Sequence, residues 1–279
     1  MVAKADGQAA ARGAASGGDV SGPGERFVEV GGQRCRVWEK GEGAAVGFLA
    51  GLGGLLHWTP FLDRLAERRR VVVPSLPGFP GAGRGHDVLD SQLDWLLATH
   101  DLLIAAGLKG ANLIGVSVGG ALAAEVAALW PELVDRLALV APLGIYVPED
   151  PVVDVWAQPP QGQAAVLCNN AANYEAATVL PAGEDLAEWQ ILQIRANEAA
   201  ARILWPLSDT RVIKRLPRIG HRTLIVWGGC DRVLSPQYAK RFAGAISGEA
   251  RVEIVEGAGH LAEIDAPDEV ARQVLSFLG

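Results

Sequence analysis

Residues 111–130, ANLIGVSVGGALAAEVAALW, join a mostly aliphatic run to a helical pattern, and a serine, Ser117, stands at the junction. The run 111–116 is typical of a strand buried on both faces of a parallel sheet. Gly115 and Gly119 flank the serine at positions where a larger side chain would collide with a sharp turn. The stretch therefore predicts a strand, a tight turn that carries Ser117, and a helix over 117–130.

The same alternation of apolar runs and helical patterns continues on both sides of this stretch. A hairpin is indicated where residues 26–30 and 34–39 flank Gly31 and Gly32. Strands alternating with helices predict an α/β fold with a doubly wound, mostly parallel sheet. The further buried strands are expected at 45–50, 70–75, 136–142, 223–229 and 251–257, and helices at 58–67, 92–106 and 267–279.

Residues 143–216 interrupt this rhythm, because they contain helical and proline-rich segments but no buried-strand pattern. The longest helix is expected at 184–205, where Pro206 ends it. We expect this segment to be a helical cap inserted over the sheet, and the core to comprise residues 25–142 and 217–279. Residues 1–24 are rich in Ala, Gly and Ser without an apolar core, which is typical of a disordered leader rather than a signal peptide.

Composition excludes several classes of protein. The net charge of −7 argues against a nucleic-acid surface, and no apolar stretch reaches the length of a membrane span. The three cysteines, Cys35, Cys168 and Cys230, are far apart and form no CxxC motif, so neither a zinc site nor a disulfide framework is indicated. We expect a cytoplasmic protein whose partner is a small-molecule substrate.

Ser117 is either an N-terminal helix cap or a nucleophile, and its place between strand and helix favours the nucleophile. A serine nucleophile needs a base, and the base needs an orienting carboxylate. His260 and Asp231 each follow a predicted strand, at the edge of the sheet where catalytic groups gather. Asp209 is the rival acid, but it lies within the inserted segment. The predicted triad is Ser117, Asp231 and His260, and the Val118 N–H at the helix start is expected to stabilise an oxyanion.

The chain resembles the α/β-hydrolase superfamily in its capped branch, which contains esterases, lactonases and meta-cleavage-product hydrolases. The motifs that carry the resemblance are GVSVGG at 115–120, LIVWGGCDRVLSP at 224–236 and VEGAGHLAEIDAPDEV at 255–270. The resemblance covers residues 25–279. It implies a second oxyanion donor, the Leu52 N–H, in a loop where Ala50 replaces the usual histidine, so the side chain that usually braces this loop is absent.

The predicted activity is a serine hydrolase that cleaves a carboxylic ester or lactone through an acyl-enzyme, without a metal or organic cofactor. Carbon–carbon hydrolases of the family carry Asn before the nucleophile and Trp after the histidine, whereas this chain has Val116 and Leu261. Carbon–carbon cleavage remains an alternative, as does a ligand receptor with slow hydrolysis. The expected pocket residues are Trp58, Trp156, Trp189, Trp205 and Leu261. They indicate an apolar or aromatic substrate, and the alternative is that the tryptophans only pack the cap onto the sheet.

Overall fold

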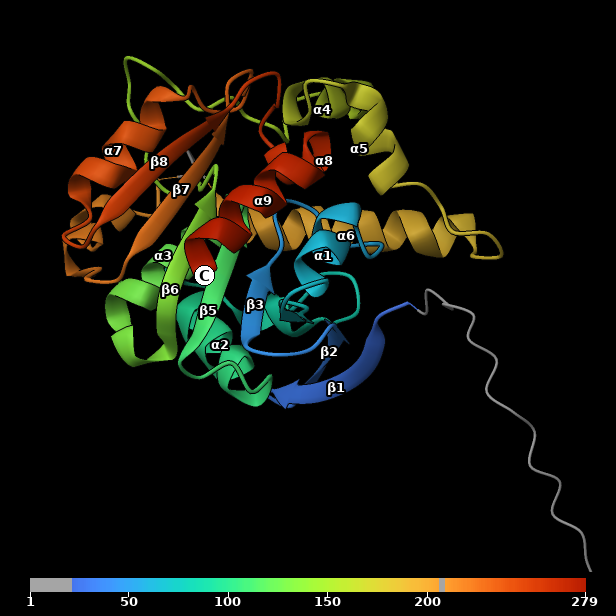
Figure 1. Ribbon diagram of the computed structural model, residues 1–279. Helices are drawn as coiled ribbons and strands as arrows, with labels where there is room; N and C mark the ends of the chain where they lie inside the picture. The colour runs from blue at the N-terminus through green and yellow to red at the C-terminus, as the bar shows by residue number, and fades with distance from the viewer. Residues whose placement is uncertain (1–21, 206–208) are drawn as a thin grey trace, which may run out of the picture.

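One eight-stranded sheet forms the centre of the protein, as seen in a computed structural model that describes residues 22–205 and 209–279 (Figure 1). The strand order is β1-β2-β4-β3-β5-β6-β7-β8. The strands are β1 (Gly24–Val30), β2 (Gln33–Lys40), β3 (Ala45–Leu49), β4 (Arg70–Pro74), β5 (Ala111–Val116), β6 (Val134–Val140), β7 (Thr223–Gly228) and β8 (Ala250–Val255).

Only the first two strands run antiparallel to their neighbours. β1 pairs with β2 through the turn at Gly31 and Gly32, whose φ angles of 56° and 73° suit glycine. β2 is antiparallel to β4, and the six strands β3 to β8 are parallel to one another. The prediction of a doubly wound, mostly parallel sheet is therefore confirmed. Residues 1–21 of the expected leader lie outside the described part of the chain.

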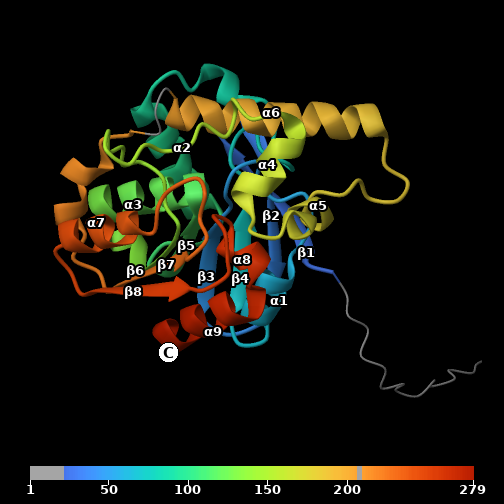
Figure 2. The same cartoon turned by 90° about the horizontal axis from the view of Figure 1, so that it is seen from above.

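Helices cover both faces of the sheet, which buries the aliphatic strands on each side (Figure 2). α1 (Pro60–Ala66) and α9 (Pro267–Leu278) contact each other on one face. α2 (Gln92–Ala105), α3 (Ser117–Leu129) and α7 (Gln237–Ala245) lie on the other face. α7 was not predicted from the sequence.

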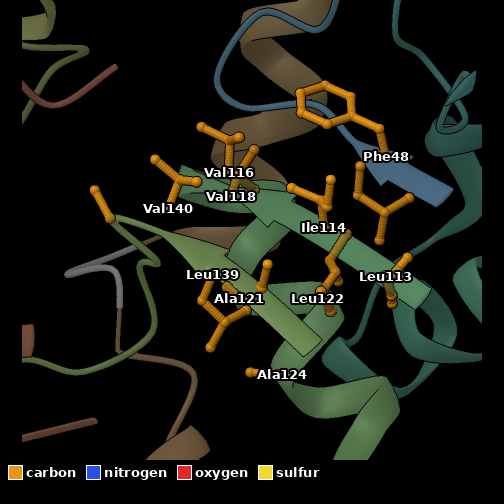
Figure 3. Packing of buried hydrophobic residues seen from close by; sticks show 14 of the residues in the cluster. Phe48, Leu113, Ile114, Val116, Val118, Ala121, Leu122, Ala124, Leu139 and Val140 are labelled. Carbon is orange, nitrogen blue, oxygen red and sulfur yellow. The ribbon is translucent and has the colours of Figure 1, made fainter. Parts of the chain in front are cut away.

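α3 is the central helix, and its sequence explains its depth in the fold. Every residue from Ser117 to Ala128 is buried, because small side chains let the helix approach β3, β5 and β6 closely. Figure 3 shows the Val118 and Leu122 side chains of this helix among those of Ile114 and Leu139. The core packing therefore fixes the helix that begins at the predicted nucleophile.

A buried ion pair gives α3 a second anchor. Glu125 is fully buried in the middle of the helix and accepts two hydrogen bonds from the Arg215 guanidinium. Thr210 donates to the same carboxylate at 3.2 Å, and Arg215 also donates to the Thr210 carbonyl at 2.7 Å. These bonds connect the nucleophile helix to the residues that lead into β7.

The chain between β6 and β7 forms helices and no strand within its described residues. These are α4 (Pro160–Leu167), α5 (Ala171–Ala177), α6 (Leu186–Leu204) and two short 3-10 helices at Val212–Lys214 and Leu216–Arg218. α6 contacts α3, and α5 contacts α8 (Ala262–Asp265). Figure 1 shows α4 and α5 beyond the carboxyl ends of the parallel strands. Pro206, the expected end of the long helix, lies outside the described residues.

No helix in the described ranges combines the length and the apolar character that a membrane crossing requires.

Candidate active site

Ser117 occupies a strained turn between β5 and α3. Its φ of 51° lies in the left-handed region, which costs a non-glycine residue on the order of 1–3 kcal/mol. A Cβ at Gly115 would come within 2.5 Å of the Gly119 carbonyl oxygen, and one at Gly119 would come within 2.3 Å of the Leu49 carbonyl oxygen. The flanking glycines are thus required by close backbone contacts, as the sequence motif predicts.

Three side chains from distant parts of the sequence form a continuous hydrogen-bonded chain at this turn. The His260 Nε2 lies 2.8 Å from the Ser117 Oγ, and the His260 Nδ1 lies 2.9 Å from the Asp231 Oδ2. All three side chains are almost completely buried, with exposures of 0% for Ser117, 1% for His260 and 0% for the Asp231 side chain. With the proton on Nδ1, the Nε2 of the imidazole is an acceptor for the serine hydroxyl.

Asp231 is held by the turn that follows β7. Its Oδ1 accepts hydrogen bonds from the backbone N–H groups of Val233 at 2.8 Å and Leu234 at 3.0 Å. The neighbouring Arg232 points elsewhere and donates to the Ala165 carbonyl at 2.8 Å. The two backbone donors fix one carboxylate oxygen, and the other oxygen is left for His260.

Asp209, the rival acid, has a different environment. It accepts a bond from the Arg211 N–H at 3.0 Å and pairs with the Arg211 guanidinium, also at 3.0 Å. The structure brings Asp231, rather than Asp209, to His260.

The residues predicted to donate to the oxyanion, Val118 and Leu52, both lie next to the serine. Val118 is in the first turn of α3, where N–H groups have no acceptor within the helix. The loop that carries Leu52 passes close to the nucleophile, because a Cβ at Gly51 would lie 3.2 Å from the Ser117 Cβ. Leu52, Ser117 and His260 also line one cavity. The backbone of Leu52 and that of Val118 thus both lie close to Ser117, and their role as oxyanion donors stays a prediction.

Arg36 braces the region next to this loop. Its guanidinium donates to the carbonyl oxygens of Leu55 and Pro80, each at 3.2 Å, and lies 3.4 Å from the ring centroid of Trp38. Burial lowers the pKa of Arg36 to about 10. A half-buried arginine on β2 thus secures the chain beyond the loop in which Ala50 stands.

Two cavities meet at the Leu52 loop. The first, which we call the nucleophile cavity, has a volume of only about 10 Å³, enough for one water molecule at most. The second, the lateral cavity, has a volume of about 390 Å³ and extends from the Leu52 loop to α4, α5 and α6. Besides Leu52, Ser117 and His260, the nucleophile cavity is lined by Leu143, Val152, Val153, Val155, Trp156, Leu167 and Val233.

The expected pocket residues separate into four groups. Trp156 lines the nucleophile cavity, and Leu261 lines the lateral cavity. Trp58 lines a neighbouring cavity and donates to the Asp63 Oδ1 at 2.9 Å. In the described part of the chain, Trp189 and Trp205 line neither main cavity, in contrast to the expectation. Trp205 is 61% exposed, because small and aliphatic side chains form the buried face of α6, namely Ala196, Ala199, Ala200 and Ile203.

Sequence reasoning missed two acidic residues that follow His260. Asp265 accepts hydrogen bonds from the backbone N–H groups of Gly259 at 2.8 Å and Asn169 at 2.6 Å, and so ties the histidine loop to the start of α5. Glu263 is 6% exposed, and burial raises its pKa to about 8. The only signal in the sequence was their proximity to the predicted base.

One group of possible metal ligands is found among the described residues, and none of its members lines the nucleophile cavity or the lateral cavity. His86, Asp87 and Glu198 bring their ligand atoms within 4.8 Å of one another. Arg84 pairs with Asp87 at 3.0 Å and Arg202 pairs with Glu198 at 3.2 Å. Because both carboxylates already have cationic partners, we assign no metal to this group.

The sequence matches the model of the alpha/beta hydrolase family over residues 48–273. The chain belongs to this family. The match spans the nucleophile turn, the Asp231 turn and the His260 loop, so the resemblance inferred from the sequence motifs is confirmed, and the protein is a hydrolase of the serine type.

Relatives of several activities are similar to the chain. It is 30% identical to the dihydrolipoyllysine-residue acetyltransferase component of the acetoin cleaving system of Pseudomonas putida, over 93% of this chain and 70% of that protein. It is 29% identical to the 2-hydroxy-6-oxo-6-phenylhexa-2,4-dienoate hydrolase of Comamonas testosteroni, over 86% and 89% of the two chains. A serine hydrolase involved in carbazole degradation has a similar crystal structure, with a TM-score of 0.70, 25% identity and coverage of 92% and 98%.

Proposed function

We propose that this protein hydrolyses a carboxylic ester or lactone of an apolar or aromatic substrate through an acyl-enzyme on Ser117. The observation that carries the proposal is the hydrogen-bonded chain from the Ser117 Oγ through His260 to Asp231 at a strained strand-to-helix turn. A serine hydroxyl is a weak nucleophile unless a base takes its proton, and an oriented imidazole is such a base.

The reaction proceeds in two halves. In the first, the Ser117 Oγ attacks the carbonyl carbon while His260 Nε2 takes the hydroxyl proton, and the N–H groups of Val118 and Leu52 bind the oxyanion. The carbon–oxygen bond to the leaving group breaks, and His260 gives the proton to the departing oxygen. In the second half, His260 takes a proton from water, the hydroxide attacks the acyl carbon, and the proton returns to Ser117 as the acid leaves.

Residues 143–216 act in this proposal as a cap. The nucleophile cavity is too small for a substrate, and six of its lining residues, from Leu143 to Leu167, belong to this segment. Substrate entry then requires the segment to move, after which closure excludes bulk water from the reacting carbonyl. The apolar lining supports an apolar acyl or alcohol group beside the nucleophile.

Carbon–carbon cleavage is the second candidate, because a dienoate hydrolase is among the similar relatives. A dienoate carries a carboxylate, which a binding site stabilises with a cation. Within the described residues, neither the nucleophile cavity nor the lateral cavity has a lysine or arginine in its lining, and the lateral cavity has Glu175 and Glu263. This distribution of charge supports an ester or lactone in preference to a dienoate.

Two further alternatives share the first chemical half. An acyltransferase, like the named acetyltransferase relative, passes the acyl group to an acceptor other than water. A receptor with slow hydrolysis stops after about one turnover. Both differ from an esterase in the fate of the acyl group, so turnover and product identity separate them.

The test is a substrate panel with purified full-length protein. It contains 4-nitrophenyl butanoate, phenyl acetate, a γ-lactone, a δ-lactone and 2-hydroxy-6-oxo-6-phenylhexa-2,4-dienoate, each with and without an added alkyl thiol. We expect many turnovers on at least one ester or lactone, with the free acid as product. Exclusive cleavage of the dienoate, a thioester as the main product, or a single turnover would each overturn the proposal in favour of the corresponding alternative.

A further inference from the structure

The lateral cavity contains a carboxyl group that the proposed reaction does not use. Glu263 is on α8, in the loop region that follows His260, and it lines both the lateral cavity and the neighbouring cavity at Trp58. The residue is only 6% exposed, and its Oε2 has no hydrogen-bond partner among the described residues. A buried polar atom without a partner is costly, so such groups commonly serve a ligand.

The cavity is next to the proposed reaction centre. Leu52 lines both the lateral and the nucleophile cavities. Two further residues of the lateral cavity adjoin the triad: Gly51 lies close to Ser117 in space, and Leu261 follows His260 in the sequence. A substrate whose carbonyl lies at Ser117 can therefore extend past the Leu52 loop towards Glu263.

The lining of the cavity has the charge for a cation. Its acidic residues are Glu263 and Glu175, and its described lining includes no lysine, arginine or histidine. Phe48 and Tyr174 supply aromatic surface, and the neutral polar side chains are Thr59, Gln163, Thr178, Gln193 and Asn197. An unpaired buried carboxyl group in such a cavity is best satisfied by a cationic hydrogen-bond donor.

We propose that the lateral cavity binds the ammonium group of an alkylamine-bearing ester or lactone and that Glu263 is the residue that selects it. That the ligand is an ester or lactone rests on the proposed function of Ser117, but the binding of its ammonium group requires no hydrolysis. Glu263 forms the direct ion pair, and Glu175, which is exposed at the outer part of the lining, contributes long-range attraction only.

The proposal implies that the affinity for the ammonium ligand depends on pH through the ionisation of Glu263. Burial, and to a smaller degree the charge of Asp265, raise the pKa of Glu263 to about 8, so the free carboxyl group is largely protonated at neutral pH. An ammonium ligand binds the ionised form and therefore displaces a proton. Burial also raises the pKa values of Cys168 and Tyr174, which keeps both neutral across this range.

The other charged and titratable groups on the elements around Glu263 are Asp265, Glu175, His57 and His260. Asp265 on α8 is held by N–H donors of the histidine loop and of the chain before α5. Glu175 belongs to α5, and His57, which lines the neighbouring cavity, lies 2.7 Å from the Val179 carbonyl oxygen. A Glu263→Gln variant leaves all of these groups in place, so it isolates the contribution of the one carboxyl group.

The experiment measures binding to the Ser117→Ala protein by calorimetry, with n-hexylammonium chloride, hexan-1-ol and sodium hexanoate as probes at pH 7 and pH 9. We expect hexylammonium to bind at least tenfold more tightly than hexanol at pH 9, and its affinity to fall about tenfold at pH 7. Adding Glu263→Gln should remove both effects without weakening hexanol. The matched control Glu175→Gln should change the ammonium affinity less than threefold.

The outcomes that overturn the inference are distinct from those that overturn the reaction. Equal affinity for hexylammonium and hexanol, no binding of any probe, tighter binding of hexanoate, or an unchanged ammonium affinity in Glu263→Gln would each exclude the ammonium site. Tighter binding of hexanol than of hexylammonium at both pH values would assign the cavity to a neutral ligand instead. Inhibition of ester hydrolysis by hexylammonium, measured with the unmodified protein, repeats the test without the Ser117 substitution. If the protein hydrolyses no ester, the proposed function fails but the binding result still stands.

Discussion

Replacement of Asp231 by asparagine tests the proposed triad with little change in shape. The Oδ1 of Asp231 accepts hydrogen bonds from the N–H groups of Val233 and Leu234, and the Oδ2 faces the His260 Nδ1 at 2.9 Å. In Asp231→Asn, the amide oxygen must stay at the two N–H donors, because an NH₂ group there would meet donors only. The NH₂ group of the amide therefore faces the His260 Nδ1.

The consequence of this orientation is a change of imidazole tautomer. A donor at Nδ1 forces that nitrogen to accept, so the ring proton moves to Nε2, which lies 2.8 Å from the Ser117 Oγ. An Nε2–H cannot take the serine proton. The comparable change in serine proteases lowers kcat about 10⁴-fold, which corresponds to about 5.4 kcal/mol of lost transition-state stabilisation. The fold keeps its two N–H bonds, so the loss of unfolding free energy should stay below about 2 kcal/mol.

The assay compares initial rates of 4-nitrophenyl butanoate hydrolysis with thermal unfolding of the same samples. Asp209→Asn is the matched control, since Asp209 pairs with Arg211 and does not contact His260. We expect the control to retain its rate within about twofold and Asp231→Asn to lose about 10³–10⁴-fold. A rate within tenfold of the unmodified protein for Asp231→Asn would refute the tautomer argument. A large loss in Asp209→Asn would move the acid to the inserted segment.

Four more substitutions test other parts of the account. Ser117→Ala should fold normally and lose at least about 10³-fold in kcat for the same ester, since no other hydroxyl or thiol group lines the nucleophile cavity among the described residues. Residual activity above a tenth would contradict this. Gly119→Ala should lower both melting temperature and kcat, because the added Cβ would come within 2.3 Å of the Leu49 carbonyl oxygen at the end of β3. Arg36→Met should lower kcat by about tenfold with little change in KM, by loosening the chain beyond the Leu52 loop; an unchanged kcat would show that the loop needs no such brace. Glu263→Gln should raise the melting temperature more at pH 9 than at pH 5. Burial raises the pKa of Glu263 in the folded protein to about 8, so its contribution to stability is greatest below its unfolded pKa and is lost as the pH rises through 8. Equal shifts of the melting temperature at both pH values would contradict the buried, unpaired carboxyl group.

The sheet could be predicted from sequence because its strands are continuous aliphatic runs between helical patterns. β5 followed by α3 is the clearest example, since Gly115, Ser117 and Gly119 leave few other conformations for the turn. α7 was missed although Tyr238 and Phe242 lie on its buried face, since the helix is short and polar between Pro236 and Ile246. α4 and α5 carry few large apolar residues, so contacts made in three dimensions determine their positions, such as that of Asn169 with Asp265.

Residues of the site were predictable where they follow strands and not where they come from the inserted segment. The carboxyl ends of β5, β7 and β8 meet at one edge of the sheet, which places Ser117, Asp231 and His260 together for any chain with this topology. No such rule orients the tryptophans of residues 143–216. Trp156 reaches the nucleophile cavity and Trp205 faces solvent, and nothing in their spacing distinguishes them.

The central claim, that Ser117 forms an acyl-enzyme, is tested most directly by trapping the intermediate. The protein is mixed with 4-nitrophenyl butanoate, quenched in acid within milliseconds to seconds, and analysed by intact mass and by peptide mapping. The account predicts a burst of 4-nitrophenol equal to the enzyme concentration and one butanoyl group on the peptide that contains Ser117, both absent from Ser117→Ala. Sustained hydrolysis with no acyl group on that peptide at any quench time, or a butanoyl group on another residue that forms and decays at the turnover rate, would contradict it.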